Sequence, residues 1–298
     1  MLLYAKEQDG NKRAVGGIYL DLFARQGKRD GAWMDDYWHY CQCGEKTYLP
    51  VAFLAANFTP PSNDQPALLL HEEVETLLHE LGHSLHHVLT EVDVLGASGI
   101  NHVAWDAVEL PSQLMENWCW QQEGLSLLAA HHATGEPIPQ TWQEQLLAAK
   151  HFQSAMHMLR QLEFALFDIR IHSTNNVQKT ETPSRTTADE IMRILAEVRQ
   201  SVRITPLYSE DRFPQSFSHI FAGGYAAGYY SYKWAEVLSA DVFSRFQQNG
   251  IMDAATGQSF RKHILAQGST QPMQDLFQAF MGRAPDIQAL LKQCGLAA

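Results

Sequence analysis

The string His79-Glu80-Leu81-Gly82-His83 constrains this chain more than any other feature of its sequence. It has the form H-E-x-x-H and lies in an apolar, helix-like run. Two imidazoles four residues apart face the same side of an α-helix, so their nitrogens can bind one metal ion. Each residue turns a helix by about 100°, which places Glu80 beside the metal and not on it. The pattern predicts hydrolysis by a metal-activated water, with Glu80 as the general base.

The surroundings of the motif decide how much weight it carries. An H-E-x-x-H string also arises by chance on surface helices, so a helical scaffold without metal is one alternative. Leucines at 77, 78, 81 and 85 give this helix an apolar face. Such a face indicates a helix that packs against a core, which favours a genuine metal site over a chance occurrence of the motif.

His86 and His87 follow on the same helix and compete for the metal. His86 lies about 10.5 Å along the axis from His79, at 1.5 Å per residue. That separation prevents a shared ion when each Zn–N bond is about 2.0–2.1 Å. A His83–His87 pair would put Ser84 in the position of the base. We therefore expect His86 and His87 to pack around the site rather than to bind metal.

A zinc site that leaves one position for water needs a third protein ligand, and a glutamate suits two histidines. Glu109 is favoured because a turn near Gly96 and Gly99 would return the chain alongside the first helix. Tryptophans at 105, 118 and 120 indicate that the returning segment is buried. A polar stripe on one face of this second helix would then face the metal. Its members are Asp106, Glu109, Gln113 and Glu116.

Three acidic side chains are candidates for orienting the ligands. Asp106 or Glu116 would accept a hydrogen bond from a ligand imidazole and so fix its tautomer. Glu75, one helical turn before His79, is a further candidate.

The stretch from His219 to Tyr232 is the other unusual feature. It contains glycines at 223, 224 and 228 and tyrosines at 225, 229, 230 and 232. One reading is a mobile segment that brings phenols over the metal, where a tyrosine hydroxyl or a histidine donates to an oxyanion. The other reading is a tyrosine-rich helix start packed in the core. The residues alone leave both readings open.

Composition excludes several classes of protein. The formal net charge is −11, from 22 basic and 33 acidic residues. This charge argues against non-specific nucleic-acid binding and against docking on an anionic membrane. No apolar stretch approaches the roughly 20 residues that span a bilayer, and the first residues lack the apolar core of a signal peptide. Four cysteines make no disulfide framework. We expect a soluble, cytoplasmic protein.

The chain divides into a strand-bearing part, residues 1–66, and a helical part, residues 67–298. Apolar runs at 17–23 and 51–58 predict two antiparallel strands of a small sheet, with a loop over 25–48 between them. Helices are expected at 67–90, 106–131, 140–172 (one or a pair), 187–202 and 225–248. Three shorter helices follow, the last from Pro285 to before Gly295. Residues 173–186 are expected to form a loop.

Taken together, these motifs resemble the thimet oligopeptidase family of zinc metallopeptidases. The resemblance covers essentially the whole chain and rests on long, specific strings. These are Leu78 to His87, Trp105 to Gln113, Glu116-Asn117-Trp118, Gln161-Leu162-Glu163-Phe164, Phe217 to Tyr225, Tyr19-Leu20-Asp21-Leu22 and Gly31-Ala32-Trp33-Met34.

The resemblance implies that His79, His83 and Glu109 bind one Zn²⁺ per chain and that Glu80 is the base. It implies that Tyr225, Tyr232 and His219 hold the substrate or stabilise the transition state. The implied fold is mainly α, a zincin-like helical metallopeptidase catalytic domain with a small antiparallel β-sheet near the N-terminus. In the family this fold borders a deep channel that admits short peptides.

One departure bears on function. Family members are considerably longer and carry an N-terminal helical region that forms the other channel wall. This chain resembles the catalytic C-terminal half alone, so the missing N-terminal half is a candidate partner. Residues 37–48 fit the family poorly and are assigned no role.

The sequence thus predicts a zinc-dependent endopeptidase acting on short oligopeptides. The alternatives are a dipeptidyl carboxypeptidase of the same family, and a fragment that binds zinc and peptide without full activity.

Overall fold

The computed structural model describes residues 1–6, 12–62, 65–173, 187–206, 208 and 210–297. It is mainly helical with a small sheet near the N-terminus, as the sequence predicts. The strands are β1 (Leu2–Lys6), β2 (Lys12–Phe23), β3 (Trp33–Trp38), β4 (Cys41–Cys43), β5 (Lys46–Tyr48) and β6 (Val51–Phe58). The first helices are α1 (His71–Val88), α2 (Trp105–Val108), α3 (Leu110–Glu116), α4 (Gln122–Leu128), α5 (Gln140–Ala149), α6 (Ser154–His172) and α7 (Ala188–Val202). The later ones are α8 (Phe213–Ser216), α9 (Ser218–Phe221), α10 (Ser231–Asn249), α11 (Ala254–His263), α12 (Met273–Met281) and α13 (Gln288–Gln293). Short 3₁₀ turns are η1 (Leu95–Ala97), η2 (Asn117–Trp120) and η4 (Leu265–Gln267).

The two predicted strands exist, as β2 and β6, but their predicted antiparallel pairing is wrong. The four-stranded sheet has the order β1-β2-β6-β3, and β2 runs parallel to β6. β1 and β3 run antiparallel to their neighbours. Parallel strands need a long connection, and residues 24–50 supply one.

The predicted loop over 25–48 is also wrong, because this connection holds β3 and the hairpin of β4 and β5. β3 is the edge strand beyond β6. Its Asp35 and Asp36 made the segment look like a loop, yet edge strands commonly carry charged residues.

Helix α1 covers one face of the sheet. Buried Ile18, Ala52 and Leu54 pack there against Val88 of the helix. Alternation along a strand sends Tyr19 and Phe53 to the opposite face, where both are exposed. The predicted apolar face of α1, with leucines at 77, 81 and 85, is the face that meets the sheet. His79 and His83 are therefore directed elsewhere, towards the rest of the molecule.

The helix predicted over 106–131 is interrupted. It consists of α2, α3, η2 and α4, with Glu109 at the junction between the first two. Pro111 lies in the first turn of α3, where its missing N–H costs nothing but prevents a continuous helix through residue 107. The break matters because it sets the direction of the Glu109 side chain.

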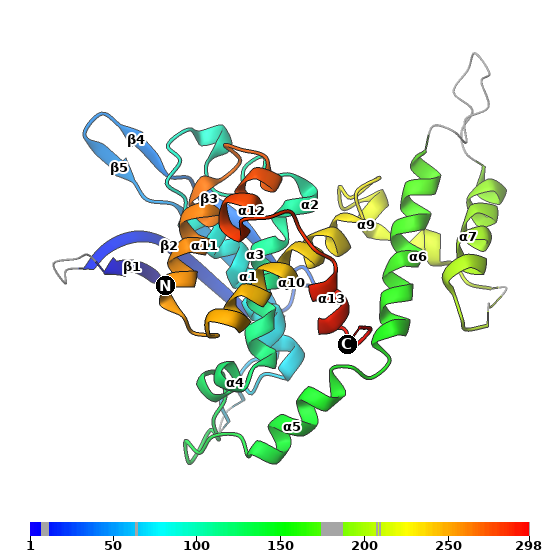
Figure 1. The fold of residues 1–298 in the computed structure, drawn as a ribbon, viewed down its shortest axis with the longest axis horizontal. Helices are drawn as coiled ribbons and strands as arrows, with labels where there is room; N and C mark the ends of the chain where they lie inside the picture. Colours follow the sequence, from blue (N-terminus) through cyan, green and yellow to red (C-terminus); the bar gives the residue numbers. More distant parts are fainter. Residues whose placement is uncertain (7–11, 63–64, 174–186, 207, 209, 298) are drawn as a thin grey trace.

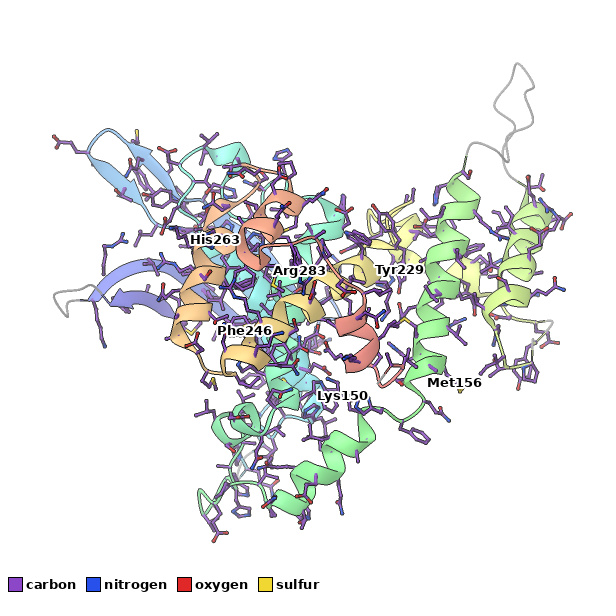
Figure 2. The ribbon with its side chains drawn as sticks, viewed as in Figure 1. Lys150, Met156, Tyr229, Phe246, His263 and Arg283 are labelled. Carbon is purple, nitrogen blue, oxygen red and sulfur yellow. The ribbon has the colours of Figure 1, made fainter. Side chains whose placement is uncertain are left out.

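The helical part contains two clusters of buried side chains. One joins α3, α10, α11 and α12 and includes Leu114, Phe243, Phe246 and Phe277, with Phe246 labelled in Figure 2. The other joins α6 and α7 to the segment before α10 and includes Phe167, Val198 and Tyr229. Figure 1 shows α6 and α7, here called the helical arm, at the opposite end of the molecule from the sheet, with α10 between them.

Several predicted boundaries hold and others move. The region 140–172 is a pair of helices, and Thr187 caps α7 by accepting from the Glu190 amide. The helix expected from residue 225 begins only at Ser231, because turns occupy 225–230. The last helix begins at Gln288 instead of Pro285. The loop expected over 173–186 lies outside the described residues beyond Ser173. Among the described helices, none combines the length and apolar character that a bilayer crossing requires.

Candidate metal centre

His79 and His83 lie one turn apart on α1, and their ring centroids are 4.9 Å apart. Gly82 lies between them and lets α3 approach closely. A Cβ atom at residue 82 would fall 2.5 Å from the Pro111 carbonyl oxygen and 2.5 Å from Ser112 Cα. Glycine at this position therefore brings the helix that follows Glu109 against the helix that carries the histidines.

Glu109 meets both imidazoles at this contact. Its Oε2 lies 3.2 Å from His79 Nε2 and 3.0 Å from His83 Nε2. Ser112 Oγ donates to the same carboxylate oxygen at 3.0 Å, and Glu109 is 4% exposed. Candidate ligand atoms of these three residues all lie within 4.8 Å of one another. We call His79, His83 and Glu109 the ligand cluster.

The residues of the ligand cluster fit a zinc ion. Ligand atoms about 2.0–2.1 Å from a tetrahedral zinc lie about 3.3 Å from each other, close to the two Glu109–histidine distances. Two imidazole nitrogens and one carboxylate oxygen leave one position open, which is the donor set of a catalytic zinc site. No other group of three or more such side chains occurs in the described part of the chain.

Glu116 orients His79. Its Oε1 lies 2.5 Å from His79 Nδ1, so Nδ1–H donates to Glu116 and Nε2 faces the ligand cluster. Burial alone would lower the pKa of His79, but hydrogen bonds to Glu109 and Glu116 raise it to about 10. Burial opposes ionisation of Glu109, yet the two imidazoles hold its pKa well below the ordinary range. Two carboxylates thus converge on His79, which is an environment suited to a cation.

Glu80 is not part of the ligand cluster, but the charges of His79, His83 and Glu109 act on its carboxyl group. It is 7% exposed. Burial raises its pKa, while His79, His83 and a backbone hydrogen bond from Met34 of β3 act in the opposite direction. A carboxyl group with a raised pKa is a stronger base than an exposed one.

The stretch from His219 to Tyr232, here called the tyrosine segment, reaches the ligand cluster through one phenol. Tyr225 Oη donates to Glu109 Oε1 at 3.3 Å. Tyr232 stacks on Tyr225 with ring centroids 4.9 Å apart, and the two hydroxyls are hydrogen-bonded. Burial raises the pKa of Tyr225 to about 12 and that of Tyr232 further, so both phenols remain donors at neutral pH.

His219 lies on α9, exposed, with its ring 6.3 Å from the rings of both Tyr225 and Tyr232. The structure therefore brings the three residues of the tyrosine segment that the sequence singled out to one place beside Glu109.

Two predicted partners lie elsewhere. Asp106 accepts a hydrogen bond from Tyr230 Oη at 3.2 Å. Glu75 accepts from Trp120 Nε1 at 2.7 Å and, with Glu116, lines a cavity of about 490 Å³. Neither has an imidazole of the ligand cluster among its described hydrogen-bond partners, so Glu116 is the acid that meets the expectation.

His86 and His87 pack as expected. His86 is fully buried, and burial lowers its pKa to about 3. His87 Nε2 lies 3.0 Å from the Trp38 carbonyl oxygen.

Sequence reasoning missed some contacts. Ser112 appears in the sequence analysis only within a string, yet its Oγ donates to Glu109. Gln113 is expected to face the metal, but its Nε2 donates to the Tyr232 carbonyl oxygen at 3.1 Å. Their place directly after Glu109 was the available signal. Nothing in the sequence indicated that the Met34 backbone lies near Glu80, because β3 itself was not predicted.

Comparison with known proteins shows the family to which this chain is related. Oligopeptidase A of Escherichia coli is 50% identical over 97% of this chain. Dipeptidyl carboxypeptidase of the same organism is 33% identical over 97% of the chain. Each match covers 41% of the relative, so the chain spans about two fifths of their length.

Solved structures share the fold. Metallocarboxypeptidase 1 of Trypanosoma cruzi superposes with a TM-score of 0.62 at 13% identity, covering 94% of this chain and 56% of that protein. The model of peptidase family M3 matches residues 5–296. With that match, and with 50% identity to oligopeptidase A over 97% of this chain, the chain belongs to peptidase family M3.

Proposed function

We propose that this chain is the catalytic part of a zinc-dependent endopeptidase that hydrolyses short oligopeptides. The observation that carries the proposal is the convergence of His79 Nε2, His83 Nε2 and Glu109 Oε2, with Glu80 next to them on α1. Membership of a peptidase family supports it.

The ligand cluster would hold one Zn²⁺. When bound, the ion lowers the pKa of a water towards about 7 and polarises a carbonyl oxygen. In the neutral imidazole of His79, Glu116 would hold the remaining proton on Nδ1 and so direct Nε2 towards the ion, and Ser112 donates a hydrogen bond to the Glu109 carboxylate. Such outer hydrogen bonds orient metal ligands and raise their basicity.

Glu80 is the proposed general base. It lies in the same turn of α1 as the two histidines, is almost fully buried, and takes no part in the ligand cluster. Its carboxylate would accept a proton from the attacking water and deliver it to the amine of the departing peptide. The backbone of Met34 in β3 lies close enough to favour the charged form of this carboxylate, which lowers its pKa.

Tyr225 and Tyr232 are the proposed donors to the oxygen that gains charge during attack. Both hydroxyls remain protonated at neutral pH, and Tyr225 Oη is within 3.3 Å of a cluster residue. A preorganised donor stabilises a developing oxyanion without reorganisation. His219, beside both rings, is proposed to contact the same part of the substrate.

A peptide substrate is supported by the sheet edge. Among the strands that the structure describes, β3 pairs only with β6 and is the edge strand of the sheet, and an edge strand can pair with an added extended chain. The backbone of Met34 in this strand is near enough to Glu80 to affect its pKa, so we propose that an extended peptide added along the edge would pass the base. Folded proteins rarely offer such an extended stretch.

A dipeptidyl carboxypeptidase is the second candidate, favoured by the 33% identity to such an enzyme over 97% of the chain. Mass spectrometry of the products from one decapeptide separates the two, because successive C-terminal dipeptides appear only in the second case.

The unmatched part of the longer relatives is a proposed partner, and the cytoplasmic location stays a prediction.

The direct test is hydrolysis of an internally quenched fluorogenic peptide by the 298-residue chain, with and without a chelator. We expect cleavage at an internal bond, loss of cleavage with chelator, and recovery with added zinc. Zinc and peptide binding without any cleavage would contradict the endopeptidase and support a binding fragment. Cleavage unaffected by chelator would contradict the metal mechanism.

A further inference from the structure

The tyrosine segment is anchored from outside by the helical arm. Asp168 of α6 is fully buried. Its Oδ1 accepts the Ala227 amide at 2.9 Å, and its Oδ2 accepts the Tyr229 amide at 2.9 Å. His172 Nδ1 lies 2.8 Å from the same carboxylate. A buried carboxylate is costly unless it is fully hydrogen-bonded, and here two of its partners are backbone amides of one loop.

A second contact from α6 meets the same loop. Gln161 precedes Asp168 by two turns, on the same face of the helix. Gln161 Oε1 accepts from Tyr229 Oη at 3.0 Å, and the Phe164 ring packs edge-on against Tyr229. Figure 2 shows Tyr229 beside α6, near the start of α10. One face of α6 is therefore fitted to the tyrosine segment.

The loop needs this support. Ala227 has a φ of 57°, in the left-handed region that costs a non-glycine residue about 1 kcal/mol or more. The Gly228 amide donates to the Tyr225 carbonyl at 2.8 Å, which closes a turn between the two residues. Of the two amides that Asp168 binds, that of Ala227 lies within this turn and that of Tyr229 follows it directly. The position of the Tyr225 backbone is thus tied to a carboxylate on another helix.

We propose that Asp168 is a positioning residue for the Tyr225 phenol, an inference that rests on the proposed function. A continuous set of contacts runs from the Asp168 carboxylate through the 227 and 229 amides and the 225–228 turn to Tyr225 Oη, 3.3 Å from Glu109. Asp168 touches neither the ligand cluster nor the sheet edge where substrate is proposed to lie. It acts by fixing where the phenol points.

The test compares Asp168→Asn with Glu163→Gln in the full chain. An asparagine is isosteric but can accept only one of the two amides well, leaving the other unpaired. We expect kcat to fall about tenfold or more, with KM changed by no more than about threefold and with one zinc per chain retained. Glu163 is an equally buried carboxylate on α6 that bonds Arg160 and Arg199 instead.

The Glu163→Gln control should leave kcat nearly unchanged. An equal fall of kcat in both variants would mean that the arm has merely loosened, and would overturn the proposal. Asp168→Ser is the second variant if the asparagine chain fails to fold, and the same fall of kcat is expected.

A double-mutant cycle with Tyr225→Phe distinguishes a positioning role of Asp168 from a purely structural one. The quantity compared is the kcat of the double variant and that of each single variant. If Asp168 acts through Tyr225, the double variant should be no slower than Tyr225→Phe alone. Losses that multiply would contradict the proposal.

Hydrogen exchange at the Ala227 and Tyr229 amides separates this inference from the proposed function. Exchange should be faster in Asp168→Asn than in the unaltered chain, whether or not the chain cleaves peptides. An inactive unaltered chain would defeat the proposed function alone, whereas unchanged exchange would defeat the role of Asp168.

Discussion

The ligand cluster and the tyrosine segment are built in different ways, although they meet at Glu109. The ligand cluster stands on two helices in direct contact, α1 and α3, with Gly82 at the crossing. The tyrosine segment runs from α9 through a series of turns to the start of α10 and is held by hydrogen bonds to α6 and α3. The comparison suggests that the two regions have separate roles, one in binding the metal and the other in turnover. Changes in the helices should affect metal binding, and changes in the segment should affect turnover while the metal stays.

The largest loss of turnover with the metal retained is expected for Glu80→Gln. The amide keeps the size of the side chain but cannot accept a proton from water, so kcat should fall about 10²–10⁴-fold. Zinc content should remain one per chain, because Glu80 is not part of the ligand cluster. Peptide hydrolysis and metal analysis on the same preparation check both expectations. A variant with a normal kcat would contradict the assignment of Glu80 as the general base.

Tyr225→Phe tests the other side of the comparison. Loss of a single oxyanion donor costs about 10²–10³-fold in kcat, and zinc content should not change. Tyr230→Phe is the matched control, because its hydroxyl bonds Asp106 outside the ligand cluster. Similar rates for the two phenylalanine variants would show that the Tyr225 hydroxyl does nothing specific.

Zinc affinity should depend on pH. His79 has a pKa of about 10 in the metal-free chain, and zinc binds only the neutral imidazole. Binding therefore displaces a proton at any pH below about 10, so affinity should rise about tenfold per pH unit between pH 6 and 8. Competition against a chelator measures this slope. Glu116→Gln removes one of the two carboxylates that raise this pKa and should flatten the slope, while a pH-independent affinity would contradict the assignment.

Gly82→Ala should give the smallest effect, and it acts on the helix crossing. The new Cβ would fall 2.5 Å from backbone atoms of Pro111 and Ser112, so α3 must shift. Overpacking of this kind costs about 1–3 kcal/mol of unfolding free energy, and zinc affinity should weaken with it. Gly257→Ala in α11 has open space around its Cβ and should stabilise by up to about 1 kcal/mol. Chemical denaturation of both variants decides whether the crossing is tight.

The helical periodicity explains what could be predicted from the sequence. The spacing of His79 and His83 fixes their common side, and the acidic residues Glu109 and Glu116 could be matched to them. The same reasoning failed for Asp106 because Pro111 breaks the helix at Glu109 and changes which residues share a face. Periodicity describes a continuous helix and says nothing of where it is broken.

Contacts between distant segments explain the rest. β2 and β6 pair in parallel across a long connection that itself contains β3, and the charged residues of β3 concealed that strand in the sequence. Asp168 lies about sixty residues from the amides that it binds. Its one local signal was a carboxylate inside the apolar run Phe167-Asp168-Ile169, which indicates burial but not a partner.

Zinc stoichiometry, measured by atomic emission on the purified 298-residue chain and on His83→Ala, tests the central claim most directly. We predict one zinc per unaltered chain and none in the variant, with the circular dichroism of both chains typical of a folded helical protein. An unaltered chain that binds no zinc, or a folded His83→Ala chain that still binds one equivalent, would contradict the account.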